Sequence, residues 1–239
     1  MIIMKKRKIY YSFHDIPSIS QHGFDYPYAY SYGEPRGLHF SKTEIRHILI
    51  AMLTLAFAFS TIFISQGLDI ISAIAVGFLG IVSSFLLHEL GHKFTAQRFG
   101  MWAEFRSYPM GLFIVIIFML ISLSKAFPFP IIFAAPGAVY IMGSAGRKEI
   151  GIVSIAGPLV NFMIALILLP VAFIFYESTI GSFFGLICFI NSLLAVFNMI
   201  PFGPLDGRKV IEWNALIWAT LMISSLLLLV AIENMVYLI

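Results

Sequence analysis

The stretch IISAIAVGFLGIVSSFLLHELGHKF, residues 70–94, joins a long apolar run to a short motif of two histidines and a glutamate. No charged side chain occurs from Ile70 to Leu87, and a run of this length can cross the hydrocarbon core of a bilayer as one helix. Ionisable residues at such a depth are costly and are usually functional. The stretch therefore predicts a membrane-spanning helix that carries a chemical site.

The composition of the whole chain is that of a membrane protein. Of its 239 residues, 60% are hydrophobic and 11% are charged, and the mean hydropathy is +0.94. One soluble core cannot bury so much apolar surface. Further apolar runs occupy residues 47–65, 112–124, 158–175, 182–200 and 215–232, although the run 112–124 is marginal on its own. We expect an all-α polytopic membrane protein with about six transmembrane helices.

Two regions depart from this helical pattern. Residues 1–46 carry a basic cluster and no long apolar run, so we expect an N-terminal cytoplasmic extension, followed by a transmembrane domain over residues 47–239. The segment after residue 124 contains Pro128, Pro130 and Pro136, which an ordinary helix would not tolerate. We expect the chain from about residue 110 to residue 147 either to cross the membrane twice, once in each half, or to form a re-entrant or β-hairpin element.

The basic residues predict the orientation in the bilayer. Seven of the fifteen lysines and arginines precede the first apolar run, at Lys5, Lys6, Arg7, Lys8, Arg36, Lys42 and Arg46. The positive-inside rule therefore places the N-terminus in the cytoplasm of a multi-pass cell-membrane protein. The second span then returns inwards, so the motif at 88–92 lies nearer the cytoplasmic side. The net charge of +3 reflects this orientation, and we expect no nucleic-acid partner.

The HELGH motif, residues 88–92, has the spacing of a metal site on a helix. His88 and His92 are four residues apart, so both imidazoles can reach one ion from the same face, with Glu89 beside the open position. Zinc favours such ligands, and a catalytic zinc site uses three protein ligands and a water whose proton Glu89 could accept. The expected topology brings Asp206 to a comparable depth as the third ligand. We therefore expect one Zn²⁺ per chain.

Other functions use part of the same pattern. A membrane metal transporter or sensor without hydrolysis would also use the two histidines and Asp206, but it gives no chemical reason for Glu89. A CAAX-type membrane metalloprotease would take a later glutamate as its third ligand. The later glutamates are Glu149, Glu177, Glu212 and Glu233, and none lies in a comparable motif. The single cysteine, Cys188, excludes a cysteine metal cluster.

Three motifs in order along the apolar segments make the chain resemble the site-2 proteases, which are intramembrane zinc metalloproteases. HELGH at 88–92 matches the family's HExxH, and NMIPFGPLDG at 198–207 looks like its second signature. AGPLVN at 156–161 is similar to its Gly-Pro-x-x-Asn element. The resemblance implies that His88, His92 and Asp206 bind zinc, that Glu89 is the catalytic base, and that Asn161 sits near the active site. It covers about residues 70–210, the expected catalytic core.

The resemblance and the expected depth together imply the substrate class. We expect regulated intramembrane proteolysis, in which peptide bonds in or near transmembrane segments of membrane proteins are cut within the lipid bilayer. Asn161 and Asn198 could hold the substrate backbone or a developing oxyanion, although helix packing explains Asn198 equally well. Pro158 could begin a helix, which would place Asn161 one turn inside it. Trp102 to Tyr108 reads as a strand that could pair with an extended substrate, or as an interfacial loop.

Overall fold

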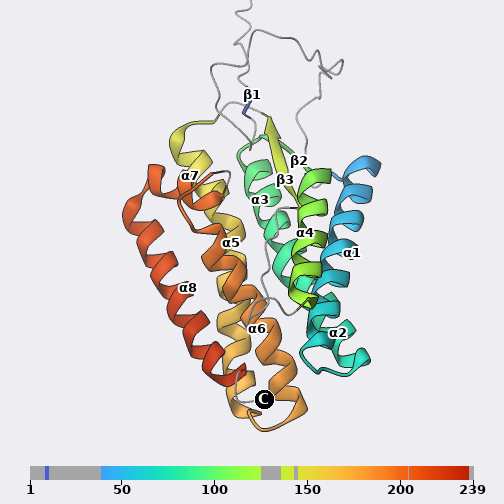
Figure 1. Ribbon diagram of the computed structural model, residues 1–239. Coiled ribbons are helices and arrows are strands. Elements are labelled where there is room, and N and C mark those ends of the chain that lie inside the picture. Colours follow the sequence, from blue (N-terminus) through green and yellow to red (C-terminus); the bar gives the residue numbers. More distant parts are fainter. Residues whose placement is uncertain (1–8, 11–38, 125–135, 143–144, 204, 237–239) are drawn as a thin grey trace, which may run out of the picture.

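The structure, a computed structural model, describes residues 9–10, 39–124, 136–142, 145–203 and 205–236. Its helices pack side by side, and a small sheet lies at one end (Figure 1). The helices are α1 (Lys42–Ser65), α2 (Ile70–Ile81), η1 (Val82–Leu86), α3 (Leu87–Arg98), α4 (Pro109–Leu123), α5 (Arg147–Ile174), α6 (Thr179–Asn198), α7 (Asp206–Trp213) and α8 (Ala215–Val236). The strands are β1 (Ile9–Tyr10), β2 (Trp102–Ser107) and β3 (Gly137–Met142).

Five helical stretches in the described part of the chain are long and apolar enough to cross a membrane. They are Lys42–Ser65, Ile70–Arg98, Arg147–Ile174, Thr179–Asn198 and Ala215–Glu233. The sixth expected span is α4, which has only 15 residues. At 1.5 Å per residue it is about 22 Å long, shorter than the roughly 30 Å hydrocarbon core. The predicted helical membrane fold is confirmed, with five long helices and one short one.

The helix that carries HELGH is continuous from Ile70 to Arg98, with a π-helical turn at its middle. This turn, η1, comprises Val82–Leu86 and ends directly before α3. A π-turn contains one extra residue, so it rotates the residues that follow it relative to those before it, and such turns are frequent at functional sites. The π-helical turn changes the direction in which the following side chains point, but it does not end the helix. The motif therefore lies inside the spanning helix.

The expectation that Pro158 begins a helix is wrong. Pro158 lies inside α5, which starts at Arg147. The polar first turn starts this helix, because the Glu149 carboxylate accepts a hydrogen bond from the Gly146 N–H at 2.9 Å. Proline is tolerated within membrane helices because neighbouring groups in the bundle compensate for the lost backbone hydrogen bond. Asn161 is consequently deep within the helix, not one turn from its start.

The predicted strand is confirmed at Trp102–Ser107, which excludes the interfacial-loop alternative. This strand, β2, pairs antiparallel with β3, from Trp102 opposite Met142 to Ser107 opposite Gly137, and β1 pairs with the other edge of β3. The Tyr108 N–H donates to the Pro136 carbonyl at 2.8 Å. The chain therefore leaves the end of β2 at the start of α4 and comes back to the same end of the sheet at the start of β3. Its prolines at 128 and 130 lie outside the described residues.

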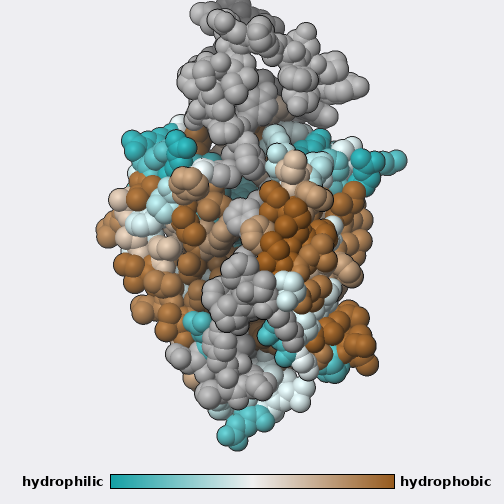
Figure 2. All heavy atoms as spheres, viewed as in Figure 1, coloured by the Kyte–Doolittle hydropathy of each residue, from teal (hydrophilic) through white to brown (hydrophobic). Residues whose placement is uncertain are grey.

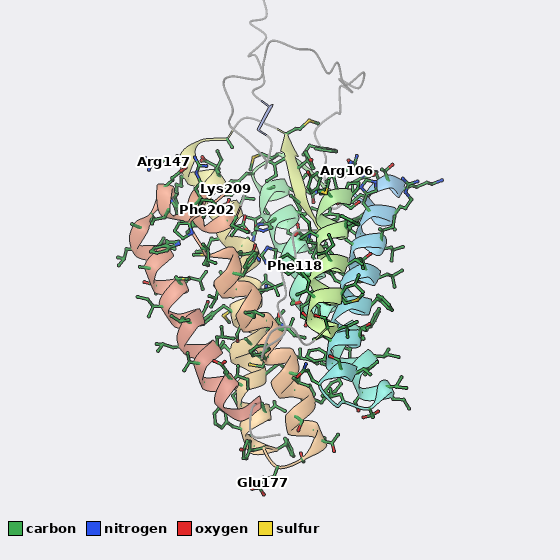
Figure 3. The ribbon with its side chains drawn as sticks, in the orientation of Figure 1. Arg106, Phe118, Arg147, Glu177, Phe202 and Lys209 are labelled. Carbon is green, nitrogen blue, oxygen red and sulfur yellow. The ribbon has the colours of Figure 1, made fainter. Side chains whose placement is uncertain are left out.

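Apolar and polar residues divide the surface into zones. Figure 2 shows hydrophobic residues covering the middle of the visible face and hydrophilic residues gathering towards its two ends. Arg106, Arg147 and Lys209 lie towards the end that carries the sheet, whereas Glu177 lies at the opposite end (Figure 3). This distribution suits a bundle whose middle is surrounded by lipid and whose ends meet water.

A buried ion pair, which we call the charge clamp, joins three elements near the sheet. The Lys93 ammonium on α3 lies 2.7 and 2.6 Å from the two carboxylate oxygens of Glu44 on α1. It also donates to the Ala103 carbonyl of β2 at 3.0 Å, and Glu44 accepts from the Phe105 N–H at 3.0 Å. Both charged side chains are buried. The clamp therefore fixes α3 against the sheet one residue beyond His92.

Candidate metal centre

The two histidines of α3 face each other across one helical turn. Their Nε2 atoms lie 3.0 Å apart, and both residues are buried. The His92 Nδ1–H donates to the Val153 carbonyl of α5 at 2.8 Å. This bond places the proton on Nδ1 and leaves the Nε2 lone pair of His92 available to a metal, as in many metal sites.

Asp206 reaches the same point from another part of the chain. Its Oδ2 atom lies 3.5 Å from the His88 Nε2 and 3.1 Å from the His92 Nε2. The other carboxylate oxygen, Oδ1, faces Lys209 at 3.8 Å. One oxygen is thus directed to the histidines while the other lies towards a cation.

The chain between α6 and α7 places Asp206 at this depth. Gly203 in this connection has φ +61°, a left-handed conformation that glycine adopts without strain. A Cβ on Gly207 would lie 2.1 Å from the Met199 carbonyl oxygen, so α7 begins in direct contact with the end of α6. The Trp218 indole N–H of α8 donates to the same carbonyl at 2.7 Å. The start of α7 is therefore held by both neighbouring helices.

The spacing of the three ligand atoms fits zinc. Zinc bonds of about 2.0–2.1 Å in tetrahedral geometry separate neighbouring ligand atoms by roughly 3.3 Å. The separations among the His88 Nε2, the His92 Nε2 and the Asp206 Oδ2 are 3.0, 3.1 and 3.5 Å. These three residues form the group that could hold a metal among the described residues. The later glutamates that a CAAX-type site would need are not part of it.

Glu89 follows His88 on the same helix and has an unusual environment. Its Oε2 atom is buried and has no hydrogen-bond partner in the described part of the chain. Burying a carboxylate oxygen without a partner is costly. A carboxylate with such an oxygen, directly after a metal ligand in the chain, is suited to accept a proton from a water molecule at the site.

The two asparagines predicted to bind substrate differ in their contacts. Asn161 on α5 is fully buried, and neither of its amide atoms has a partner within the described ranges. The Asn198 amide donates to the Leu194 carbonyl of its own helix at 3.0 Å. Asn161 therefore has free hydrogen-bonding capacity, whereas one Asn198 donor is used within α6.

Sequence reasoning missed two parts of this centre. The Val153 carbonyl orients His92, but a backbone group leaves no signal in the residue type. Trp218 holds the loop before Asp206, yet a tryptophan in an apolar helix reads as a packing residue. Finding either contact requires the spatial arrangement of α5, α7 and α8.

Comparison with known proteins identifies the family. The model of peptidase family M50 matches residues 76–178. The chain is 40% identical over 182 residues to "Putative zinc metalloprotease MJ0611" of Methanocaldococcus jannaschii, covering 75% of this chain and 89% of that protein. It is 30% identical over 140 residues to "Zinc metalloprotease MJ0392" of the same organism, covering 58% of this chain and 34% of that protein.

A bacterial relative shares the same region. The chain is 31% identical over 145 residues to "Putative zinc metalloprotease Rip2" of Mycolicibacterium smegmatis, covering 56% of this chain and 54% of that protein. No solved structure matches the chain. The matched family region contains HELGH and AGPLVN, and the structure adds Asp206 to the two histidines. The chain is a multi-pass membrane protein that belongs to peptidase family M50, the site-2 protease family of intramembrane zinc metalloproteases.

Proposed function

We propose that His88, His92 and Asp206 hold the zinc of this protease and that Glu89 is its catalytic base. The main support for this proposal is that three ligand atoms lie 3.0–3.5 Å apart inside a bundle of membrane-spanning helices. A carboxylate with one buried oxygen that has no partner in the described structure follows the first of these ligands in the chain. A binding site alone would not need this second, costly group.

Each residue of the site has a separate role in the proposed peptide hydrolysis. When bound, zinc acts as a Lewis acid and lowers the pKa of a water molecule towards neutrality. Glu89 would take a proton from the water that attacks the peptide carbonyl and would then deliver this proton to the departing amine. The Val153 carbonyl holds the His92 ring in place throughout. Lys209, near the second oxygen of Asp206, helps to keep that carboxylate ionised.

Asn161 is the proposed contact to the reacting carbonyl. Its amide is buried and free of other partners in the described structure, so its N–H groups can donate to the oxygen that gains charge during attack. Asn198 is proposed as a second substrate contact, through the hydrogen-bonding capacity left beside its bond to Leu194.

Transmembrane proteins are the proposed substrates. In a helical substrate each carbonyl is occupied by an internal hydrogen bond, so the segment must unwind before it can be cut. An extended segment can then pair with a sheet edge, and the β2–β3 sheet lies beside the helix that carries the histidines. The proposed edge is that of β3 next to β1, because the outward Ala103 carbonyl and Phe105 N–H of β2 are bonded to Lys93 and Glu44. Helix-breaking residues in a substrate should therefore favour its cleavage.

The orientation follows from the distribution of basic residues. We place the N-terminal extension, residues 1–46, in the cytoplasm and the active site nearer the cytoplasmic side. Arg106, Arg147 and Lys209 lie at the same end of the bundle, which supports this assignment (Figure 3). The protein would act within the cell membrane, in contact with the lipid bilayer.

The substitution Glu89→Gln tests the proposal. It keeps the size of the side chain but removes the base, so zinc content should persist while cleavage falls by about 10²–10⁴-fold. Purified protein would be incubated with a panel of membrane proteins, with and without a zinc chelator, and the cuts mapped by mass spectrometry. Glu177→Gln, at the far end of the bundle, is the matched control.

Two results would reject parts of the proposal. Cleavage at the wild-type rate by the Glu89→Gln variant would show that Glu89 is not the base. Cuts confined to soluble loops of the substrates would contradict hydrolysis within the membrane. A transporter or sensor would hold zinc but release no peptide with either the wild-type protein or the variant.

A further inference from the structure

Two successive turns of α5 contact the histidines of the metal centre, and Asn161 follows one turn later. Val153, Gly157 and Asn161 are spaced four residues apart, so they lie on the same side of the helix. The first supplies the carbonyl that orients His92, and the third supplies the buried free amide. The middle residue, Gly157, has no side chain.

The backbones of α3 and α5 touch at this level. A Cβ on Gly91, in the middle of HELGH, would lie 3.1 Å from the Ala156 carbonyl oxygen and 3.2 Å from the Val160 side chain. The helices are therefore too close for side chains to separate them here. Any atom added to α5 at the next residue, Gly157, must enter the space between the histidines.

The geometry at Gly157 is more restrictive still. A Cβ on this residue would lie 2.4 Å from the His92 Nε2 and 2.6 Å from the His88 Nε2, where real Cβ atoms essentially never approach within 3.0 Å. The His92 ring cannot swing aside without losing its bond to the Val153 carbonyl. The colliding atoms are the same two nitrogens that face Asp206.

We propose that Gly157 is a positioning residue whose missing side chain leaves room for the metal. This inference rests on the proposed zinc site. A bound zinc lies about 2.0–2.1 Å from each ring nitrogen. A methyl group 2.4–2.6 Å from the same two nitrogens either takes the space of the ion or pushes the rings apart. Both results destroy the 3.0–3.5 Å triangle of ligand atoms.

The test compares Gly157→Ala with Gly80→Ala. Both add one methyl to a buried glycine of a membrane-spanning helix, but the methyl at Gly80 meets the flexible tip of Ile190, at 2.5 Å, and no metal ligand. Zinc stoichiometry, zinc affinity and thermal unfolding with and without zinc would be measured on each purified full-length protein. Gly157→Ala should stay folded but lose zinc affinity by on the order of 10²-fold or more, at least the loss seen when a group supporting a metal ligand is removed. Gly80→Ala should bind zinc like the wild type.

A second pair of variants tests the proposal even if Gly157→Ala does not fold in the wild-type background. In a His88→Ala, His92→Ala background the rings are absent, so the added methyl has room. Gly157→Ala should then leave the melting temperature of the zinc-free protein unchanged or raise it, since alanine favours a helix more than glycine does. In the wild-type background it should lower the melting temperature.

The outcomes separate the two proposals. Wild-type zinc affinity in Gly157→Ala would overturn the role of Gly157, as would an equal loss of stability in both backgrounds. Absence of zinc from the wild-type protein would instead reject the proposed metal site. In that case the zinc-free melting temperatures still decide whether the methyl collides with the two rings.

Discussion

Asp206 is the ligand whose removal distinguishes a three-ligand site from a histidine pair. Asp206→Ala leaves only two nitrogens, 3.0 Å apart, so zinc binding should weaken by 10-fold or more, because losing even a group that merely supports a metal ligand costs about 10–100-fold. Metal analysis after dialysis against a graded zinc buffer measures this loss. Glu212→Ala is the control, since this exposed glutamate on the same helix pairs with Arg208. Equal zinc affinity in the two variants would remove Asp206 from the site.

Asn161 offers a second prediction at the scale of one side chain. Asn161→Ala should keep zinc and fold while turnover falls by on the order of 10²-fold, as when one oxyanion donor is removed. Leucine at this position should do no better, because its shape restores no donor. Melting temperature, zinc content and cleavage rate would be measured on one preparation. A variant that is less stable but fully active per zinc would assign Asn161 to packing.

At this scale the sequence predicts side chains well and backbone groups poorly. The meeting of His88 and His92 could be predicted because residues four apart share one face of a helix. Asp206 could be added because the topology and the motif agree. The Val153 carbonyl and the empty space at Gly157 could not, since both depend on how closely α5 approaches α3.

The charge clamp is the element-scale feature with the largest expected energetic effect. Lys93→Met leaves the Glu44 carboxylate buried without its cation, which typically costs about 3–5 kcal/mol. The double variant Lys93→Met, Glu44→Gln should recover part of this loss because no charge then remains buried. Unfolding by denaturant in detergent would measure both. Arg208→Ala, which removes an exposed pair on α7, should have little effect. If Lys93→Met is no more harmful than Arg208→Ala, the clamp does not stabilise the fold.

The helices were predicted more reliably than their ends. Hydropathy reports the stretch in contact with lipid, so it placed the apolar run of α5 at residue 158 and missed the charged first turn that begins at Arg147. It also assigned Pro158 to a helix start, because an isolated sequence shows the lost hydrogen bond but not the neighbouring helices that compensate for it. The strand at Trp102–Ser107 could be recognised because apolar and polar residues alternate along it. Its pairing with β3 could not, because it depends on where the chain returns after α4.

The distribution of basic residues over the whole molecule predicts its orientation in the membrane. Single cysteines introduced at residues 98, 147 and 208 should react with a membrane-impermeant reagent only from the cytoplasmic side, and those at 68 and 178 only from outside. The native Cys188 is fully buried, so it should contribute little background. Accessibility of residue 147 from outside would reverse the orientation and place the metal centre nearer the other face of the membrane.

The burial of the charge clamp has a consequence for how the protein responds to ionic strength. Mobile ions screen exposed charges over a Debye length of about 8 Å at physiological salt, but they cannot enter the interior between α1, α3 and β2. Added salt should therefore weaken the exposed Arg208–Glu212 pair while leaving the Lys93–Glu44 contact unchanged. The attachment of the histidine helix to the sheet would then be the same in a dilute buffer and in a concentrated one.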